Sequence, residues 1–214
     1  IIDKCPAISY LPESLKKIPN RFNNAKFIWI IRHPGSVIRS FENMPMAEVM
    51  LKGLPNINSA EDAWKIGNKN VRNFLEKQPE NNWLMLRYED LVREPEKSIK
   101  PVLEMLNLPF DSSVLNPYQG DRMREGPAGA RAIGDPNMAN RGKIDESLAD
   151  SWLNGFDPRS VSNETKELAF TLDYNLDKMN LPPLAEVSGA APPPQRVQRH
   201  VRRPTFFFIL DLEI

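Results

Sequence analysis

Residues 26–31 (KFIWII) form an apolar run that stops abruptly at residues 32–35 (RHPG). The length of this run and its β-branched content predict a β-strand that is buried on both faces. Pro34 suits the first turn of a helix, where its missing N–H group is not needed. Apolar side chains then follow at helical spacing, at Val37, Ile38 and Phe41. The segment therefore predicts a strand, a tight turn and a helix, in that order.

Strands and helices continue to alternate further along the chain. Ser59 precedes Asp62 by three residues, as at a capped helix start, and one apolar helical face follows at Ala63, Trp64, Val71, Phe74 and Leu75. Residues 83–86 (WLML) predict a second buried strand. Pro95 opens another helix, in which Pro101 costs a hydrogen bond and the buried stripe is expected at Ile99, Val102, Leu103 and Leu106. This alternation predicts an α/β fold, with helices on the faces of a parallel sheet and ligands beyond the carboxyl ends of its strands.

The chain changes character near residue 180. A length of 214 residues suits one domain, which we place at residues 1–180, and no internal repeat is visible. Residues 181–214 are rich in proline and arginine and cannot bury enough apolar surface to offset the entropy of ordering. They predict a linker or a disordered tail. The first residues show neither an initiator Met nor a signal-peptide pattern, so we expect a chain cut from a longer one.

Composition narrows the classes of partner. Lys plus Arg and Asp plus Glu number 28 each, so no overall basic field favours nucleic acid or an anionic membrane. No apolar stretch reaches the length of a membrane-spanning helix. The single cysteine, Cys5, excludes an internal disulfide framework and fits a small buried residue better than a nucleophile. Two distant histidines make no metal site. We expect a cytoplasmic protein that uses no metal.

Arg32 ends the first predicted strand and suggests a local anion site. The helix after it would present the unpaired backbone N–H groups of its first turn, at Gly35, Ser36 and Val37. A guanidinium fork, a helix N-terminus and the hydroxyls of Ser36 and Ser40 could together bind one phosphate. An arginine that caps the sheet edge beside solvated serines would produce the same pattern, so spacing alone leaves both interpretations open.

The segment also resembles the nucleotide-binding segment of the sulfotransferase family, in which Arg-Asn-Pro or Arg-His-Pro is followed by a serine eight residues after the arginine. By this resemblance Arg32 and Ser40 bind the 3′-phosphate of the sulfate donor, 3′-phosphoadenosine 5′-phosphosulfate. Residues 87–91 (RYEDL) resemble a second family segment, whose tyrosine approaches the adenine ring, which implicates Tyr88. A Tyr packed in a corner, with Glu89 and Asp90 solvated or capping, is the structural alternative.

Later segments resemble the same family, especially bacterial sulfotransferases such as those in modular polyketide assembly lines; they lie at residues 121–123, 133–137, 144–145 and 149–152. Residues 120–143 are rich in glycine and basic side chains, and the resemblance implies a lid whose Arg141 and Gly142 reach the 3′-phosphate. A solvated basic loop is the alternative. Residues 3–6 (DKCP) resemble the segment whose lysine lies near the transferring sulfuryl group, which makes Lys4 the catalytic candidate, against an ordinary exposed lysine.

The resemblance implies a three-layer, parallel-sheet fold of the P-loop nucleotide-binding type, incomplete at the N-terminus because no Gly-rich phosphate loop follows an early strand. It implies sulfuryl transfer to a hydroxyl acceptor, either a small molecule or a carrier-bound chain. A non-catalytic nucleotide-binding or interaction module of the same fold is the main alternative, and a kinase fragment is disfavoured. No side chain presents itself as general base, since His33 suits a helix cap better. The sequence does not determine the oligomeric state.

Overall fold

The computed structural model describes residues 3–43, 53–54, 56–119, 143–153 and 155–178. Among them lie two strands, β1 (Phe27–Ile31) and β2 (Trp83–Arg87), which pair in parallel with Phe27 opposite Trp83 and Ile31 opposite Arg87. Helix α5 (Ala60–Leu75) lies in the connection that crosses from β1 to β2. Both predicted strands and their parallel pairing are confirmed.

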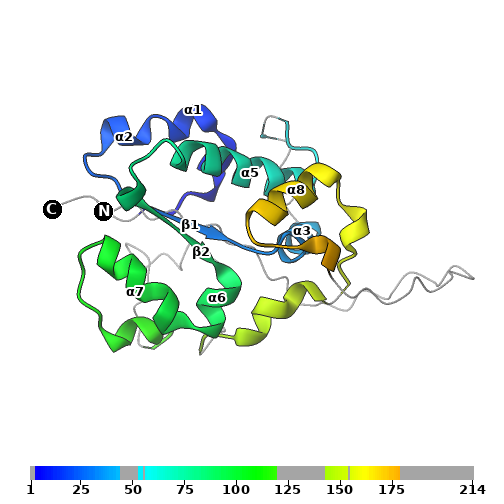
Figure 1. Cartoon of the computed structure of the whole chain (residues 1–214). Coiled ribbons are helices and arrows are strands. Elements are labelled where there is room, and N and C mark those ends of the chain that lie inside the picture. The colour runs from blue at the N-terminus through cyan, green and yellow to red at the C-terminus, as the bar shows by residue number, and fades with distance from the viewer. Residues whose placement is uncertain (1–2, 44–52, 55, 120–142, 154, 179–214) are drawn as a thin grey trace, which may run out of the picture.

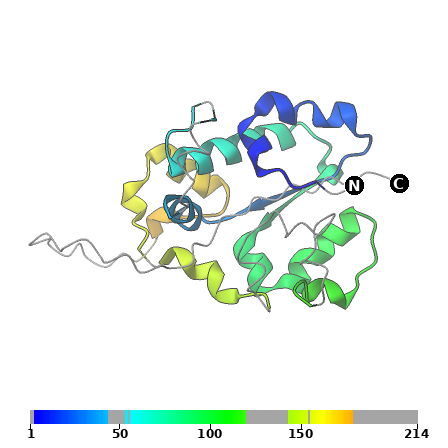
Figure 2. The ribbon, with the colours of Figure 1, turned by 180° about the vertical axis from the view of Figure 1, so that it is seen from behind.

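Helices cover the sheet on both faces (Figure 1). One side carries α1 (Pro12–Leu15), α2 (Ile18–Arg21) and α5, and the other side carries α6 (Tyr88–Arg93) and α7 (Pro95–Met105). Helices α3 (Pro34–Glu42) and α8 (Asn163–Thr171) lie together beyond the carboxyl end of β1. The view from behind shows the same order of layers (Figure 2). The predicted α/β architecture is therefore present, with α5 on one face and α7 on the other.

Strand β1 feeds two separate hydrophobic clusters, as alternation of side chains along a strand requires. Phe27, Trp29 and Ile31 belong to the cluster that contains Trp64 and the rest of the buried face of α5. Ile28 and Ile30 point the other way and pack with Leu86 and Val102. All five residues of β1 are buried. The prediction that this strand is buried on both faces is confirmed.

Strand β2 and helix α7 are less buried than the sequence predicts. Only Leu86 of β2 is buried, and the other residues of that strand are half-buried. On α7 only Val102 is buried, while Ile99 and Leu106 pack against the cluster from its margin. Among the described residues β2 pairs with β1 alone, so one of its edges lacks a neighbour. The prediction of a buried second strand was therefore wrong for all but Leu86, because apolar content does not specify which layer will cover a strand.

Local capping follows the sequence closely. Ser59 accepts a hydrogen bond from the Asp62 N–H at 3.0 Å and begins α5, as predicted. Pro34 and Pro95 occupy the first turns of α3 and α7, and Pro101 lies inside α7. Cys5 is half-buried.

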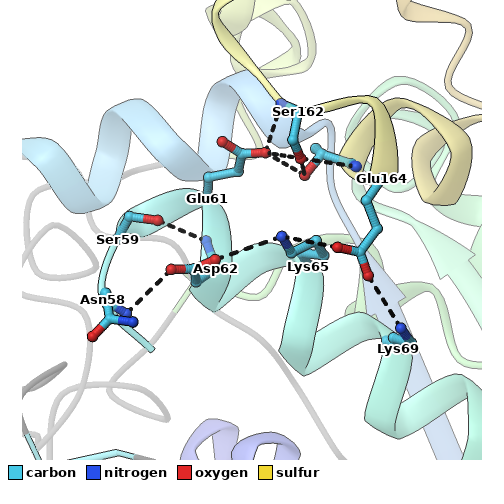
Figure 3. Close-up of polar contacts among 9 residues, drawn as sticks. Asn58, Ser59, Glu61, Asp62, Lys65, Lys69, Ser162 and Glu164 are labelled. Carbon is cyan, nitrogen blue, oxygen red and sulfur yellow. Dashed lines mark hydrogen bonds and ion pairs between the residues drawn. The ribbon is translucent and has the colours of Figure 1, made fainter. Parts of the chain in front are cut away.

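A polar cluster joins α5 to α8, and we call it the α5–α8 cluster (Figure 3). Glu61 accepts hydrogen bonds from the Ser162 N–H at 2.9 Å, the Ser162 hydroxyl at 2.6 Å and the Thr165 hydroxyl at 2.5 Å. Glu164 pairs with Lys65 at 3.3 Å and with Lys69 at 3.1 Å. Ser162 also caps α8. These contacts attach α8 to the long helix that packs on β1.

Within the part of the chain that the structure describes, no helix combines the length and the apolarity needed to cross a membrane. The same residues contain no group of three or more His, Cys, Asp or Glu side chains arranged to hold a metal ion.

Candidate functional site

The candidate site lies at the carboxyl ends of the two strands. The register that places Ile31 opposite Arg87 brings the next residues, Arg32 and Tyr88, side by side. The Arg32 guanidinium lies over the Tyr88 ring, 4.3 Å from its centroid, in a cation–π contact. Two residues that were singled out separately in the sequence are thus in contact. This is the edge of a parallel sheet where ligands bind in open α/β folds.

The first turn of α3 differs from the sequence prediction. The Gly35 N–H donates to His33 Nδ1 at 3.1 Å, and the N–H groups of Ser36 and Val37 donate to the His33 carbonyl at 3.0 and 3.2 Å. The expectation that these N–H groups are unpaired was therefore wrong, because His33 caps the helix with its ring and its carbonyl together. The Phe156 ring also covers this turn, since a Cβ on Gly35 would lie 2.4 Å from it.

His33 is a structural cap. Its side chain accepts the capping hydrogen bond, as the sequence favoured, and only 5% of the residue is exposed. The ring stacks on Trp152 at 4.4 Å between centroids and meets Phe156 and Tyr174 edge-on. Burial, with smaller contributions from the charges of Arg87 and Arg32, lowers the pKa of His33 from 6.5 to about 3. The imidazole is therefore neutral at neutral pH, as an acceptor of the Gly35 N–H must be.

Glu89 is the buried acid of the site, with 3% of its surface exposed. One carboxylate oxygen accepts from the His33 backbone N–H at 2.8 Å, and the other accepts from the Tyr174 hydroxyl at 2.6 Å. Burial and the charge of Glu89 raise the pKa of Tyr174 well above its ordinary value, so this hydroxyl stays protonated as a donor. The structural alternative for this segment placed Glu89 in solvent or in a cap, whereas Glu89 is buried, and the sequence did not single out Tyr174.

Ser151 comes from a distant segment, the 3₁₀ helix η7 (Glu146–Leu153). Arg32 Nη2 donates to the Ser151 hydroxyl at 3.1 Å and to the Leu148 carbonyl at 3.2 Å. The Ser36 hydroxyl lies 2.9 Å from the Ser151 hydroxyl, and Arg39 Nη1 donates to the Ser151 carbonyl at 3.4 Å. Sequence reasoning assigned no role to Ser151, although residues 149–152 were among the family-like segments.

Helix η7 is firmly packed against the rest of the site. Leu148 and Ala149 are buried, and Asp150 pairs with Arg93 of α6 at 2.6 Å. Trp152 stacks on His33. A pocket of about 220 Å³ opens beside this helix and is lined by His33, Arg87, Glu89, Arg93, Ala149, Asp150, Trp152, Asp173, Tyr174 and Asn175. We call Arg32, His33, Tyr88, Glu89, Ser151 and Tyr174 the strand-end cluster.

Four predicted site residues remain: Ser40, Lys4, Arg141 and Gly142. Ser40 is half-buried on α3, one turn after Ser36. Lys4 is exposed, just before the 3₁₀ helix η1 (Pro6–Tyr10), and its place beside the reacting group stays a prediction. Arg141 and Gly142 lie outside the described residues.

The sequence and the fold of the chain are both similar to those of known proteins. Residues 1–112 match a family model described as the sulfotransferase family. The fold is similar to the sulfotransferase domain from the curacin biosynthetic pathway, with 39% identity, a TM-score of 0.72 and coverage of 81% of this chain and 62% of that one. It is also similar to the sulfotransferase domain from the Synechococcus PCC 7002 olefin synthase, with 32% identity, a TM-score of 0.69 and coverage of 81% and 58%.

A curated relative is more distant. Sulfotransferase 1C2 of Homo sapiens is 23% identical over 178 residues, which are 76% of this chain and 55% of that protein. The chain thus spans between 55% and 62% of the length of these relatives. The match of the family model over more than half of the chain and the similarity of fold to two sulfotransferase domains lead to one conclusion: the chain belongs to the sulfotransferase family.

Proposed function

We propose that the chain binds the nucleotide end of 3′-phosphoadenosine 5′-phosphosulfate and works as part of a sulfotransferase that transfers the sulfuryl group to a hydroxyl acceptor. The observation that carries the proposal is the contact between Arg32 and Tyr88 at the carboxyl ends of adjacent parallel strands. A guanidinium suits a phosphate monoester, and an aromatic ring suits a purine. The two side chains lie close enough to serve the two parts of one nucleotide.

The 3′-phosphate would be held by side chains rather than by the backbone of α3. Arg32 supplies the positive charge, and the hydroxyls of Ser36 and Ser151 lie next to it, 2.9 Å apart. A hydroxyl can turn its hydrogen towards an anion when one arrives. Ser40 follows one turn later on the same helix. We therefore add Ser151 to the two residues, Arg32 and Ser40, that the family resemblance implies.

The reaction itself demands positioning and charge stabilisation. The S–O bond to the 5′-phosphate breaks, a new S–O bond forms to the acceptor oxygen, and the acceptor gives its proton to a base. In this proposal Lys4 stabilises charge at the sulfuryl group, and Arg141 with Gly142 closes over the 3′-phosphate. The acceptor is a small molecule or a carrier-bound chain that bears a hydroxyl. We assign no residue as the base.

A non-catalytic nucleotide-binding module is the second candidate. Neither of the two described strands is followed by a Gly-rich phosphate loop, the element that by the family resemblance would hold the 5′-phosphosulfate. Both candidates need the same nucleotide site, and they differ only in turnover. Transfer of labelled sulfate from the donor to a hydroxyl acceptor would establish the enzyme, whereas nucleotide binding without transfer over a broad acceptor panel would favour the module.

The nucleotide site is tested by titrating 3′-phosphoadenosine 5′-phosphate into the chain in a calorimeter. Arg32→Ala should weaken binding by about 100-fold, because loss of a charged partner to a phosphate costs several kcal/mol. Arg72→Ala is the matched control, since Arg72 is a surface arginine that pairs with Glu76 on α5. If the chain does not bind this nucleotide, or if Arg32→Ala binds it as tightly as Arg72→Ala does, the proposal is wrong.

A further inference from the structure

The peptide unit between Arg32 and His33 is held at both of its polar atoms by side chains from other elements. Trp64 Nε1 donates to the Arg32 carbonyl at 2.9 Å. Glu89 accepts from the His33 N–H at 2.8 Å. Trp64 belongs to α5 and Glu89 to α6, which lie on opposite sides of the sheet (Figure 1). This one peptide group is thus hydrogen-bonded by side chains from the helices on both sides of the sheet.

This double contact fixes the direction in which Arg32 leaves the backbone. A peptide unit is planar, so anchoring its oxygen and its N–H at the same time prevents the plane from turning about either hydrogen bond. The plane includes the Cα of Arg32, from which the side chain departs. Trp64 is fully buried and Glu89 is 3% exposed, so little of either side chain is open to competition from water.

The two anchors are themselves held in place. Tyr174 donates its hydroxyl to the second oxygen of Glu89 at 2.6 Å. On the other side, the Asn68 side chain donates to the Trp64 carbonyl at 2.7 Å and accepts from Trp29 Nε1 at 3.2 Å. Buried polar networks with every group satisfied keep their members in one geometry. The two hydrogen bonds therefore hold the Arg32–His33 peptide in one orientation.

We infer that Trp64 and Glu89 are positioning residues for the nucleotide site: they aim the Arg32 guanidinium at the 3′-phosphate without touching the ligand. This inference rests on the proposed function. A positioning role predicts a selective loss of affinity for one class of nucleotide, which a purely structural role does not predict. Misplacing Arg32 harms only ligands that carry a 3′-phosphate, so adenosine 5′-phosphate, which lacks that group, serves as the internal reference.

The test measures affinity for 3′-phosphoadenosine 5′-phosphate and for adenosine 5′-phosphate, and the readout is the ratio of the two. Trp64→Phe keeps an aromatic side chain and removes the donor, and it should lower the preference for the 3′-phosphorylated nucleotide by about 5- to 10-fold, the worth of one buried hydrogen bond. Trp83→Phe is the matched control, because Trp83 lies at the opposite end of β2, where it pairs with Phe27, and takes no part in the contacts that hold the Arg32–His33 peptide.

A second pair of variants tests the other anchor. Glu89→Gln keeps an acceptor for the His33 N–H and should retain most of the preference, whereas Glu89→Met, of similar length but with only a weakly accepting thioether, should lose it. Circular dichroism and melting curves check that each variant is folded. An unchanged ratio in folded Trp64→Phe, or an equal loss of both nucleotides, would overturn the inference. A wild-type chain that shows no preference for the 3′-phosphate would instead overturn the proposed function.

Discussion

The strand-end cluster and the α5–α8 cluster are built from similar polar side chains in different surroundings. In the strand-end cluster, His33 and Glu89 are almost entirely buried, and each carboxylate oxygen of Glu89 accepts a hydrogen bond from a buried residue. In the α5–α8 cluster, the side chain of Glu164 is 55% exposed and forms ion pairs with Lys65 and Lys69 (Figure 3). Burial makes the two hydrogen bonds of Glu89 costly to lose, whereas water can replace the exposed ion pairs of Glu164.

The difference suggests a division of roles. The α5–α8 cluster attaches one helix to another by contacts that overlap, since Ser162 and Thr165 both donate to Glu61. The strand-end cluster favours one geometry, because the hydrogen bonds of Glu89 join groups that are almost entirely buried. A site that must hold a guanidinium at a defined place for a phosphate benefits from the second arrangement.

The largest expected effect comes from comparing the two glutamates. Glu89→Ala leaves the His33 N–H and the Tyr174 hydroxyl buried without an acceptor, and should lower the free energy of unfolding by about 3–5 kcal/mol. Glu164→Ala removes two exposed ion pairs and should cost less than about 1 kcal/mol. Denaturant titration of both variants gives the two values, and similar losses in the two would contradict the distinction drawn between the clusters.

An intermediate effect is expected at His33. His33→Ala removes the α3 cap and the stack on Trp152 and should cost about 2 kcal/mol, whereas His33→Asn keeps a capping acceptor and should cost about half as much. Both are measured by denaturation at pH 7. Equal costs for the two variants would show that capping contributes nothing.

The same residue predicts a pH dependence. The pKa of His33 is about 3 in the folded chain against an ordinary 6.5. Between pH 3 and pH 6.5 the unfolded chain therefore binds a proton at this residue and the folded chain does not. The stabilising contribution of His33 is therefore complete above pH 6.5 and declines as the pH falls towards 3. The advantage of the wild type over His33→Asn should narrow below pH 6.5 in melting curves; a constant difference would argue against a buried neutral imidazole.

The smallest effects come from a pair of serines with opposite expected consequences. Ser162→Ala removes the cap of α8 and a donor to Glu61, and should cost about 1 kcal/mol of stability without changing nucleotide binding. Ser151→Ala should leave stability nearly unchanged but weaken 3′-phosphoadenosine 5′-phosphate about 10-fold, as expected for a hydrogen bond to a charged group. Tighter nucleotide binding by Ser151→Ala would mean that Ser151 competes for Arg32 instead of assisting it.

Much of the fold follows from local patterns. The apolar runs at β1 and β2, the prolines that open α3 and α7 and the Ser59 cap all lie where the sequence predicts them. Burial was harder to predict, since the apolar residues of β2 resemble those of a central strand, yet most of them are half-buried. The depth at which a strand lies depends on which elements cover it, and local composition does not contain that information.

The site was predictable in part. Arg32 and Tyr88 were singled out by resemblance to a family, and their contact follows from the parallel register. The capping geometry of His33 was foreseen, but its consequence for the three N–H groups of α3 was not. Ser151 and Tyr174 lie more than a hundred residues beyond Arg32, and no spacing rule connects them to it. Glu89 stands next to Tyr88 in the sequence, but only the structure shows that it is buried and accepts hydrogen bonds from the His33 N–H and the Tyr174 hydroxyl.

By itself the sequence determined the alternation of strands and helices, the parallel sheet and the identity of the arginine at the end of β1, because these depend on periodicity and on the chemistry of single residues. Only the tertiary structure decided which donors near that arginine are already used, which serine faces it and which side chains hold its peptide. Those outcomes depend on the packing of η7, α5 and α6 around one strand end, and packing brings together groups that are distant in the chain.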